Sequence, residues 1–368
     1  MIVSLVGFGL LAGSIASAIR QSAKNIKIHA ISSPQNAPLA VKKGLADRSF
    51  SYDEIEQWLP ISDLVLLCGP ASNIVENIES IKKHVHLVQR DLVISDIGST
   101  KLEICQLGAT LPAPLLFVGG HPMAGSEKRG FEHSDPFIFE NAYWILCPER
   151  NIQPEAYQKL VDVINITGAH QVTLAAQEHD RIMARLSHAP QLISTALAAS
   201  IPPWIVENDY QHLAGRGFRD MTRIAASPWQ MWKDIIQTNT TEITHSLNEI
   251  KTVIDDIICS MENSKLKDAK LADFFKQGSD IRASLSSTGK GFAQSLHEVM
   301  VHIPDQPGAL LGVIEPLVQH GLNVLDIELA KVREGVGGTL LLGFKNLEDA
   351  HLCVKILEVK DLKAKVRI

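Results

Sequence analysis

The sequence predicts an α/β domain with a doubly wound parallel sheet, followed by an all-α domain and a small C-terminal α+β domain. Short apolar runs alternate with helical stretches over residues 1–175, which is typical of a doubly wound sheet. Residues 176–285 carry apolar side chains at three- and four-residue spacing, which indicates helices. Residues 296–368 follow the order β-α-β-β-α-β. A chain of 368 residues is also too long for one ordinary core.

The composition indicates a soluble globular protein whose main partner is not nucleic acid. Apolar residues make up 45% and charged residues 21%, and the formal net charge is −6 without a basic stripe. The five cysteines are scattered without a Cys-x-x-Cys pair, which predicts reduced thiols in the cytoplasm and no zinc site. Residues 1–19 are uncharged but lack the basic start of a signal peptide, so we expect neither secretion nor a membrane partner.

The chain opens with a dinucleotide-binding motif. Residues 1–6 form a short apolar run, as expected for a strand buried on both faces. The segment Gly7-Phe8-Gly9-Leu10-Leu11-Ala12 follows with the pattern G-x-G-x-x-A and leads into a helix. Gly7 permits the tight turn, Gly9 leaves room for a pyrophosphate, and Ala12 allows helix and strand to pack closely. In this strand–turn–helix context, the motif predicts a Rossmann domain that binds NAD or NADP at a helix N-terminus.

The end of the second strand favours NADP. After residues 26–31, an NAD enzyme usually presents an acid to the ribose 2′-hydroxyl. Here Ser32 and Ser33 follow instead, which removes the repulsion of a 2′-phosphate. No arginine follows directly, and Lys42 and Lys43 lie further on, so the NADP signal is incomplete.

The remaining predicted strands place more residues at the cofactor. These strands are residues 64–68, 92–96, 115–120 and 142–147. Ligands of such sheets collect beyond the carboxyl ends of the strands. We therefore expect Gly69, Pro70 and Asp96 to line the cofactor site.

Five polar segments follow these strands or lie in the helical stretch. They are D-I-G-S-T-K at 96–101, H-P-M-A-G-S-E-K-R-G at 121–130, E-H-D at 178–180, S-H-A-P at 187–190 and G-F-R-D-M-T-R-I-A at 217–225. Together with the glycine loop, they resemble the prephenate and arogenate dehydrogenases, in the right order over nearly the whole chain. The second and fifth segments are the most specific.

The resemblance implies an oxidoreductase of tyrosine biosynthesis. Such an enzyme transfers a hydride from prephenate to NAD(P)⁺ and releases CO₂, and aromatisation to 4-hydroxyphenylpyruvate drives the step. Arogenate dehydrogenase, which forms tyrosine directly, stays open as the alternative substrate class. The resemblance also implies that the helical region closes over the nicotinamide and forms the interface of a homodimer.

The same resemblance assigns catalytic roles to two residues. His121 is expected to draw the proton from the substrate hydroxyl, and an imidazole suits this task because its ordinary pKa of about 6.5 lies near working pH. Ser99 is expected to hydrogen-bond the hydroxyl and the histidine. Structural roles compete with both: His121 could cap a strand, and Ser99 could cap a helix.

Six further residues are expected at the substrate. Arg223 matches the arginine that grips a substrate carboxylate, with Arg219 assisting, although a surface ion pair is the alternative for Arg223. The remaining four are Ser126, Glu127, His188 and Gln191. The family has a second histidine where this chain has Gln191. That departure puts prephenate preference and tyrosine inhibition at the active site in doubt.

The C-terminal segment resembles an ACT domain, a small amino-acid-sensing module. Its first turn has the pattern D-x-P-G at 305–308 and leads into a helix whose N-terminus suits a carboxylate. The expected effector positions are Asp305, Gly308, Leu310 and Asn323, and tyrosine is the expected effector. A ferredoxin-like domain used only for assembly is the alternative.

Two other readings of the whole chain compete with this one. A different hydroxyacid dehydrogenase would rely on a lysine of the helical region, and nothing here reproduces that site. A non-catalytic sensor of cofactor and amino acid would not need Ser99, His121 and Arg223 together.

Overall fold

The computed structural model forms two compact units, residues 1–256 and 257–368, and each is described by itself. The structure describes residues 1–23, 25–125, 128, 130–149, 151–262, 267–286, 296–333 and 337–367. Among these, no helix is both long and apolar enough to span a bilayer.

Eight strands of the first unit form one sheet in the order β3-β2-β1-β4-β5-β6-β7-β8. Their bounds are β1 Ile2–Val6, β2 Lys27–Ile31, β3 Arg48–Phe50, β4 Leu64–Leu67, β5 Leu92–Asp96, β6 Leu115–Pro122, β7 Tyr143–Cys147 and β8 His170–Thr173. Neighbours from β3 to β6 are parallel, β7 is antiparallel to β6, and β8 is parallel to β7. The first six strands thus have the order of a dinucleotide-binding domain, which confirms the predicted Rossmann-type sheet.

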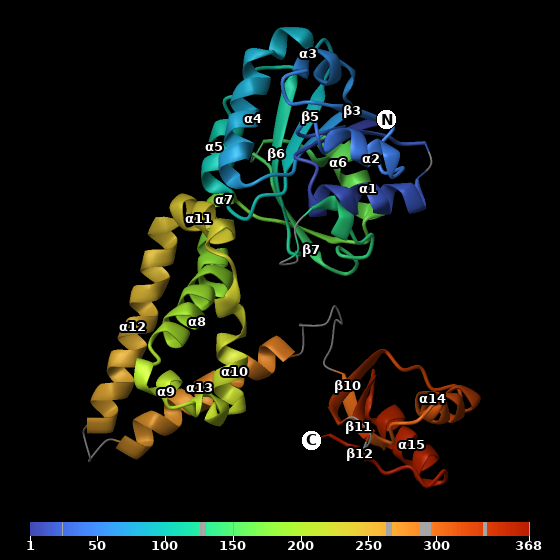
Figure 1. Cartoon of the computed structure of the whole chain (residues 1–368), viewed down its shortest axis with the longest axis vertical. Helices are drawn as coiled ribbons and strands as arrows, with labels where there is room; N and C mark the ends of the chain where they lie inside the picture. The colour runs from blue at the N-terminus through green and yellow to red at the C-terminus, as the bar shows by residue number, and fades with distance from the viewer. Residues whose placement is uncertain are drawn as a thin grey trace. The chain divides into compact units, whose positions relative to one another are not determined.

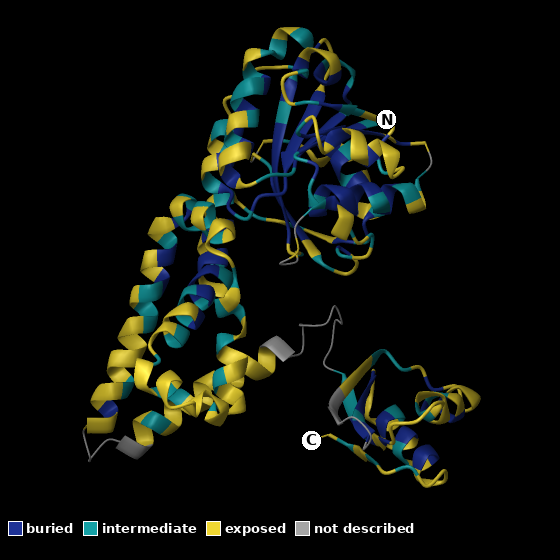
Figure 2. Ribbon diagram, in the orientation of Figure 1, coloured by how far each residue is buried: buried dark blue, intermediate teal, exposed yellow. Residues whose placement is uncertain are grey.

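Helices cover both faces of this sheet (Figure 1). Helices α1 (Leu10–Ser22) and α6 (Gln158–Ile166) pack on one face, and α4 (Ala71–Lys83) and α5 (Leu102–Gly108) on the other. Because strand side chains alternate between faces, Leu64 and Leu66 of β4 join the first core, whereas Val65 and Leu67 join the second. The central strands are therefore buried on both sides, as Figure 2 shows in dark blue.

The rest of the first unit is helical, as expected. Its longer helices are α7 Ala176–Met183, α8 Ala189–Ala199, α11 Trp229–Thr238 and α12 Thr240–Glu262, with the π-helical turn η5 Ala184–His188 between α7 and α8. The apolar run from Ile235 to Met261 predicts one continuous helix, but the structure breaks it at Asn239. There the side-chain amide of Asn239 donates to the backbone oxygen of Asp180, 2.8 Å away, which ties the break to α7.

The second unit contains α13 (Lys267–Ser286) and a four-stranded antiparallel sheet in the order β10-β11-β9-β12. The predicted β-α-β-β-α-β order is confirmed by β9 His297–Ile303, α14 Ala309–Gln319, β10 Asp326–Arg333, β11 Gly337–Phe344, α15 Leu347–Glu358 and β12 Ala364–Val366. Both helices pack on one face of the sheet around Val301, Leu317 and Leu357.

Two expectations for this unit are wrong in detail. The pattern of residues 322–332 predicts a strand that begins at Leu322, but β10 begins at Asp326, and Leu322 is instead buried in the core ahead of it. The Ser- and Gly-rich residues 278–291 predict a polar connection between domains, but the chain continues as helix α13 as far as Ser286. In that helix Lys276 and Asp280 form an i,i+4 ion pair of 3.0 Å, a contact that supports a solvated helix.

Candidate active site

The glycine loop between β1 and α1 has the backbone that a bound pyrophosphate requires. Gly7 has φ of +90°, and a Cβ there would lie 3.0 Å from the backbone oxygen of Cys68. At Gly9 the nearest atom to a Cβ would be 4.0 Å away, so the space beside it is open. Gly9 gives α1 no side-chain cap, and no acid lies in the first turn. The first N–H groups of α1 are therefore available to a phosphate.

Two cavities meet at this loop. One of about 370 Å³ is lined by Gly7, Phe8, Gly9, Ser32, Tyr52, Gly69 and Pro70, among others. The second, of about 580 Å³, is lined by Leu10, Leu11, Gly69, Pro70, Ser99, Thr100, Ala124 and further residues. Most of the residues predicted at the cofactor line one of them, so the residues present fit a dinucleotide. Ala12 is fully buried behind the loop, and Ser33 lines neither cavity.

Asp96 lies behind these cavities rather than on them. It is fully buried, and its carboxylate pairs with the equally buried ammonium of Lys101. The same carboxylate accepts hydrogen bonds from the N–H of Gly98 at 2.8 Å and of Gly120 at 3.0 Å. A Cβ on Gly120 would come within 2.4 Å of the backbone oxygen of Asp96, so glycine is required there. Asp96 thus fastens β5 to β6 and to the turn that leads to Ser99.

His121 stands at one end of a series of buried, hydrogen-bonded polar side chains. It lies near the end of β6, and its Nδ1 is 2.8 Å from Nε2 of His179 on α7. Nδ1 of His179 is 2.7 Å from the carboxylate of Asp180. That carboxylate also accepts the N–H groups of Lys101 at 2.7 Å and Leu102 at 2.8 Å. The N-terminal turn of α5 and the imidazole pair are thereby held by one acid.

The surroundings keep His121 neutral. Burial lowers the pKa of His121 well below its usual value, and the neighbouring His179, Lys101 and His188 act in the same direction. Among the described residues, no hydrogen bond occupies the second ring nitrogen, Nε2. A neutral imidazole with a free nitrogen can accept a proton.

His188 is buried next to this chain but does not line either cavity. Its Nδ1 lies 3.2 Å from the amide nitrogen of Asn239, and its ring meets Trp232 edge-to-face. Burial lowers the pKa of His188 to about 4. It is therefore a neutral side chain at pH 7.

The other residues expected at the substrate lie in different surroundings. The amide of Gln191 donates to the backbone oxygen of Ile224 at 2.8 Å, which joins α8 to the turn η7 (Arg223–Ala226). Arg219 is exposed, and its Nε donates to the backbone oxygen of Ala214 at 3.0 Å. Arg223 is also exposed, and the described part of the chain offers it no carboxylate. Ser126 and Glu127 lie outside the described residues.

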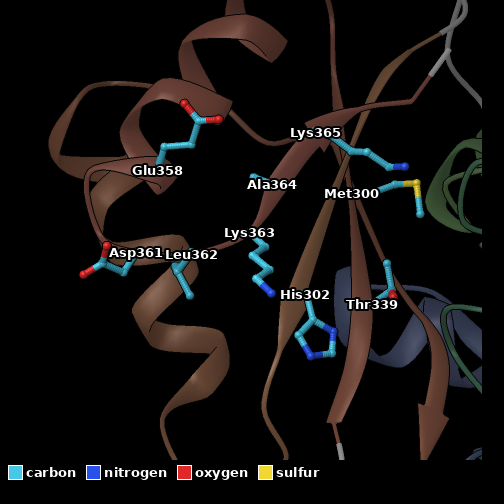
Figure 3. A pocket seen from close by; sticks show the side chains of 9 residues that line it. All are labelled: Met300, His302, Thr339, Glu358, Asp361, Leu362, Lys363, Ala364 and Lys365. Atoms are coloured by element: carbon cyan, nitrogen blue, oxygen red, sulfur yellow. The ribbon is translucent and has the colours of Figure 1, made fainter.

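The predicted effector residues are exposed in the second unit. Asp305, Gly308 and Leu310 lie at the start of α14, where Gly308 has φ of +84°, whereas Asn323 follows the other end of that helix. A separate open cavity of about 490 Å³ lies between β9, β12 and the end of α15 (Figure 3). It is lined by His302, Lys363 and Lys365 together with Glu358 and Asp361, and by none of the four predicted residues.

Four residues of the site received no role from the sequence. They are Lys101, His179, Asp180 and Asn239. Lys101 and the pair His179-Asp180 stand inside two of the polar segments, so the segments carry a signal. Asn239 stands in a polar run, Q-T-N-T-T-E at 237–242, that interrupts the apolar helical spacing.

Comparisons with known proteins agree with this architecture. Residues 15–173 match the prephenate dehydrogenase nucleotide-binding domain, and residues 175–277 match the prephenate dehydrogenase dimerization domain. A prephenate dehydrogenase of Bacillus subtilis (strain 168) is 30% identical over 363 residues, which cover 97% of this chain and 96% of the relative. One of Lactococcus lactis subsp. cremoris is 29% identical and covers 97% of both chains.

A solved structure extends the comparison to three dimensions. The prephenate dehydrogenase from A. aeolicus, in complex with hydroxyphenyl propionate and NAD⁺, superposes with a TM-score of 0.68 at 26% identity. The match covers 77% of this chain and 98% of that one. Sequence, domain order and fold thus agree over most of the length, and the chain belongs to the prephenate dehydrogenase family.

Proposed function

We propose that this protein oxidises prephenate with NAD(P)⁺ to 4-hydroxyphenylpyruvate and CO₂. The observation that carries the proposal is His121, a buried neutral imidazole whose Nε2 has no hydrogen bond to any residue that the structure describes, in a chain of this family. The nicotinamide, when bound, supplies the hydride acceptor. His121 takes the hydroxyl proton at Nε2, and Ser99, which lines the larger cavity, orients the substrate hydroxyl.

Arg223 is proposed to hold a substrate carboxylate, with Arg219 beside it. Both side chains are exposed, and neither pairs with an acid within the ranges that the structure describes. A guanidinium without an ion-pair partner is available for bidentate binding of a carboxylate. His188 and Gln191 would then shape the site from behind, because their polar atoms are engaged within the helical region.

We propose that the helical region forms the interface of a homodimer. Large apolar side chains are exposed there on several elements, and relatives of this region form a dimerization domain. The exposed side chains include Trp204, Val206, Tyr210, Leu213, Met221 and Trp229. We further place the enzyme in the cytoplasm, because all five cysteines are free.

NADP is proposed to serve at least as well as NAD. Ser32 lines the smaller cavity where an NAD enzyme would present an acid, and the ammonium of Lys43 lies 5.2 Å from the ring of Phe131 on the same cavity. Glu132 lines that cavity as well and is the one carboxylate among its described lining residues.

A two-by-two assay tests the proposed function. Prephenate and arogenate are each offered with NAD⁺ and with NADP⁺, and reduced nicotinamide is followed. We expect turnover of prephenate, with NADP⁺ supporting at least the kcat/KM of NAD⁺, and Ser32→Asp should shift the preference toward NAD⁺. Turnover of arogenate alone would replace the substrate. A preference for NAD⁺ above about tenfold, or about 1.4 kcal/mol, would contradict the cofactor assignment.

A further inference from the structure

One hydrogen bond between two buried imidazoles decides which nitrogen of His121 acts as the base. His121 and His179 are joined through Nδ1 and Nε2, 2.8 Å apart, and their rings meet edge-to-face. Behind them, Nδ1 of His179 lies 2.7 Å from Oδ1 of Asp180. Both members of this second pair are at most 2% exposed. His179 and Asp180 stand in one of the segments that carry the family resemblance, E-H-D at 178–180, but the sequence assigned neither of them a role.

The acid at the end of this chain sets the direction of both hydrogen bonds. An ionised carboxylate only accepts, so Nδ1 of His179 carries the proton. When His179 is neutral, its Nε2 then has a lone pair and accepts a hydrogen bond from Nδ1–H of His121. Nε2 of His121 is left unprotonated, which is the state that a base needs.

Asp180 is itself held in place from three directions. Its carboxylate accepts the backbone N–H groups of Lys101 at 2.7 Å and of Leu102 at 2.8 Å. Its backbone oxygen accepts the amide N–H of Asn239 at 2.8 Å. The start of α5 thus holds the carboxylate, and Asn239, between α11 and α12, holds the backbone of the same residue, so Asp180 is fixed beside His179.

We propose that His179 and Asp180 are positioning residues that hold His121 as the Nδ1–H tautomer, so that its Nε2 faces the substrate hydroxyl as an acceptor. The proposal rests on the proposed function. When the hydroxyl proton moves to Nε2, both nitrogens of His121 are protonated, and Nδ1–H stays hydrogen-bonded to Nε2 of His179. The electron pair of the broken O–H bond forms the C=O bond as hydride leaves the same carbon, and a bound oxidised nicotinamide would be the acceptor of that hydride.

The charges around His121 make a neutral His179 important. Apart from His179 itself, the groups that act on His121 are Lys101, whose ammonium pairs with Asp96, and His188, which is neutral at pH 7. A protonated His179 would donate from Nε2 and repel the imidazolium that forms on His121. A neutral His179 instead accepts a hydrogen bond from that imidazolium and stabilises it.

Nitrogen-15 NMR of histidine-labelled protein with bound oxidised cofactor reads the tautomer directly. We expect His121 at pH 7.5 to carry its proton on Nδ1, with Nε2 unprotonated. The opposite tautomer would overturn the proposal. Because this readout needs no turnover, it stands even if the protein oxidises neither prephenate nor arogenate, in which case the proposed function alone fails.

Paired substitutions test the consequence for catalysis. His179→Leu removes the acceptor, and we expect kcat to fall about 10- to 100-fold while KM and the cofactor Kd change less than about twofold. His179→Gln should recover part of kcat, because its side-chain oxygen can accept from Nδ1–H. Gln177→Leu, an exposed position on the same helix, is the matched control and should keep wild-type kinetics. An unchanged kcat in a folded His179→Leu protein would overturn the positioning role. So would an equal loss of kcat in His179→Leu and His179→Gln together with a raised KM.

Discussion

At the scale of single residues, Arg219 and Arg223 are both exposed and are proposed to bind the substrate. Arg223 stands in a 3₁₀ turn directly after α10 (Arg216–Thr222), and its guanidinium has no acidic partner among the residues that the structure describes. A buried ion pair would have given it a structural role. Because Arg223 is exposed, we propose that it binds the substrate carboxylate. Steady-state kinetics tests this role, whereas a measurement of the free energy of unfolding does not.

Arg223→Ala should raise KM for prephenate about 10- to 100-fold, because a charge-assisted bidentate contact is worth on the order of 1.5–3 kcal/mol. Arg216→Ala is the matched control, since Arg216 is an exposed arginine on the neighbouring helix α10 that pairs with Asp220 at 3.4 Å. Steady-state kinetics and a cofactor titration measure both variants. If cofactor affinity is lost while the KM for prephenate is unchanged, Arg223 binds the cofactor instead of the substrate carboxylate.

The sequence indicated which residues follow the strand ends, but it did not indicate which of them contact one another. The polar segments place Ser99 and His121 at strand ends, and the structure puts them there. Asp96 has the same signal, yet Lys101, five residues on, turns back and buries it. The hydrogen bond between His121 and His179 spans 58 residues, and no local pattern records such a contact.

At the scale of elements, the glycine turn is the most demanding piece of backbone. Gly7 and Gly9 differ in what they require, although the motif treats them alike. Gly7 needs a left-handed φ and has a neighbouring backbone oxygen at its missing Cβ, whereas Gly9 has an ordinary φ and open space. The two positions therefore separate folding from cofactor binding.

Gly7→Ala should destabilise the protein without cofactor by about 1–3 kcal/mol, because a positive φ and a close backbone contact both oppose the new methyl group. Gly9→Ala is the paired variant and should change the free energy of unfolding by less than about 1 kcal/mol, while weakening cofactor binding through the space that its Cβ fills. Urea unfolding without cofactor and a fluorescence titration with NADPH measure the two effects. Equal stability of the two variants would contradict the assignment of strain to Gly7.

Elements were predictable where their pattern is long and apolar. Strands β1, β2, β4, β5, β6 and β7 follow from their apolar runs. The outer strands β3 and β8 do not, because three or four residues such as Arg48–Phe50 and His170–Thr173 carry too short and too polar a pattern. The break at Asn239 has a local signal in the polar run Q-T-N-T-T-E at 237–242, but its contact with Asp180 of α7 lies far away in the sequence and could not be predicted.

At the scale of the whole molecule, the C-terminal sheet has a hydrophobic core of its own. Val301, Leu317, Phe344 and Leu357 belong to one cluster formed within residues 296–367. The match to the Bacillus subtilis relative covers 97% of this chain and so extends into this segment. We propose regulation by tyrosine here, since Gly308 at the start of α14 leaves the helix N-terminus exposed.

A chain ending at residue 290 should remain a folded, active dimer and lose inhibition by tyrosine. Coupling between an effector and an active site is typically about 1–3 kcal/mol, so the full chain should lose roughly 5- to 150-fold in substrate affinity when tyrosine binds. Kinetics with and without tyrosine, together with sedimentation, compare the two chains. Full tyrosine sensitivity of the shortened chain would place inhibition at the active site and leave the C-terminal sheet an assembly role.

Product stoichiometry and rate in the wild type and in His121→Asn test most directly whether the protein oxidises prephenate with His121 as the proton acceptor. The wild type should form one 4-hydroxyphenylpyruvate, one CO₂ and one reduced nicotinamide for each prephenate consumed. His121→Asn should bind cofactor normally, yet form all three products at least about 100-fold more slowly, because the proton acceptor is gone. Near-normal turnover by His121→Asn, or reduced nicotinamide without CO₂ from the wild type, would contradict the central claim.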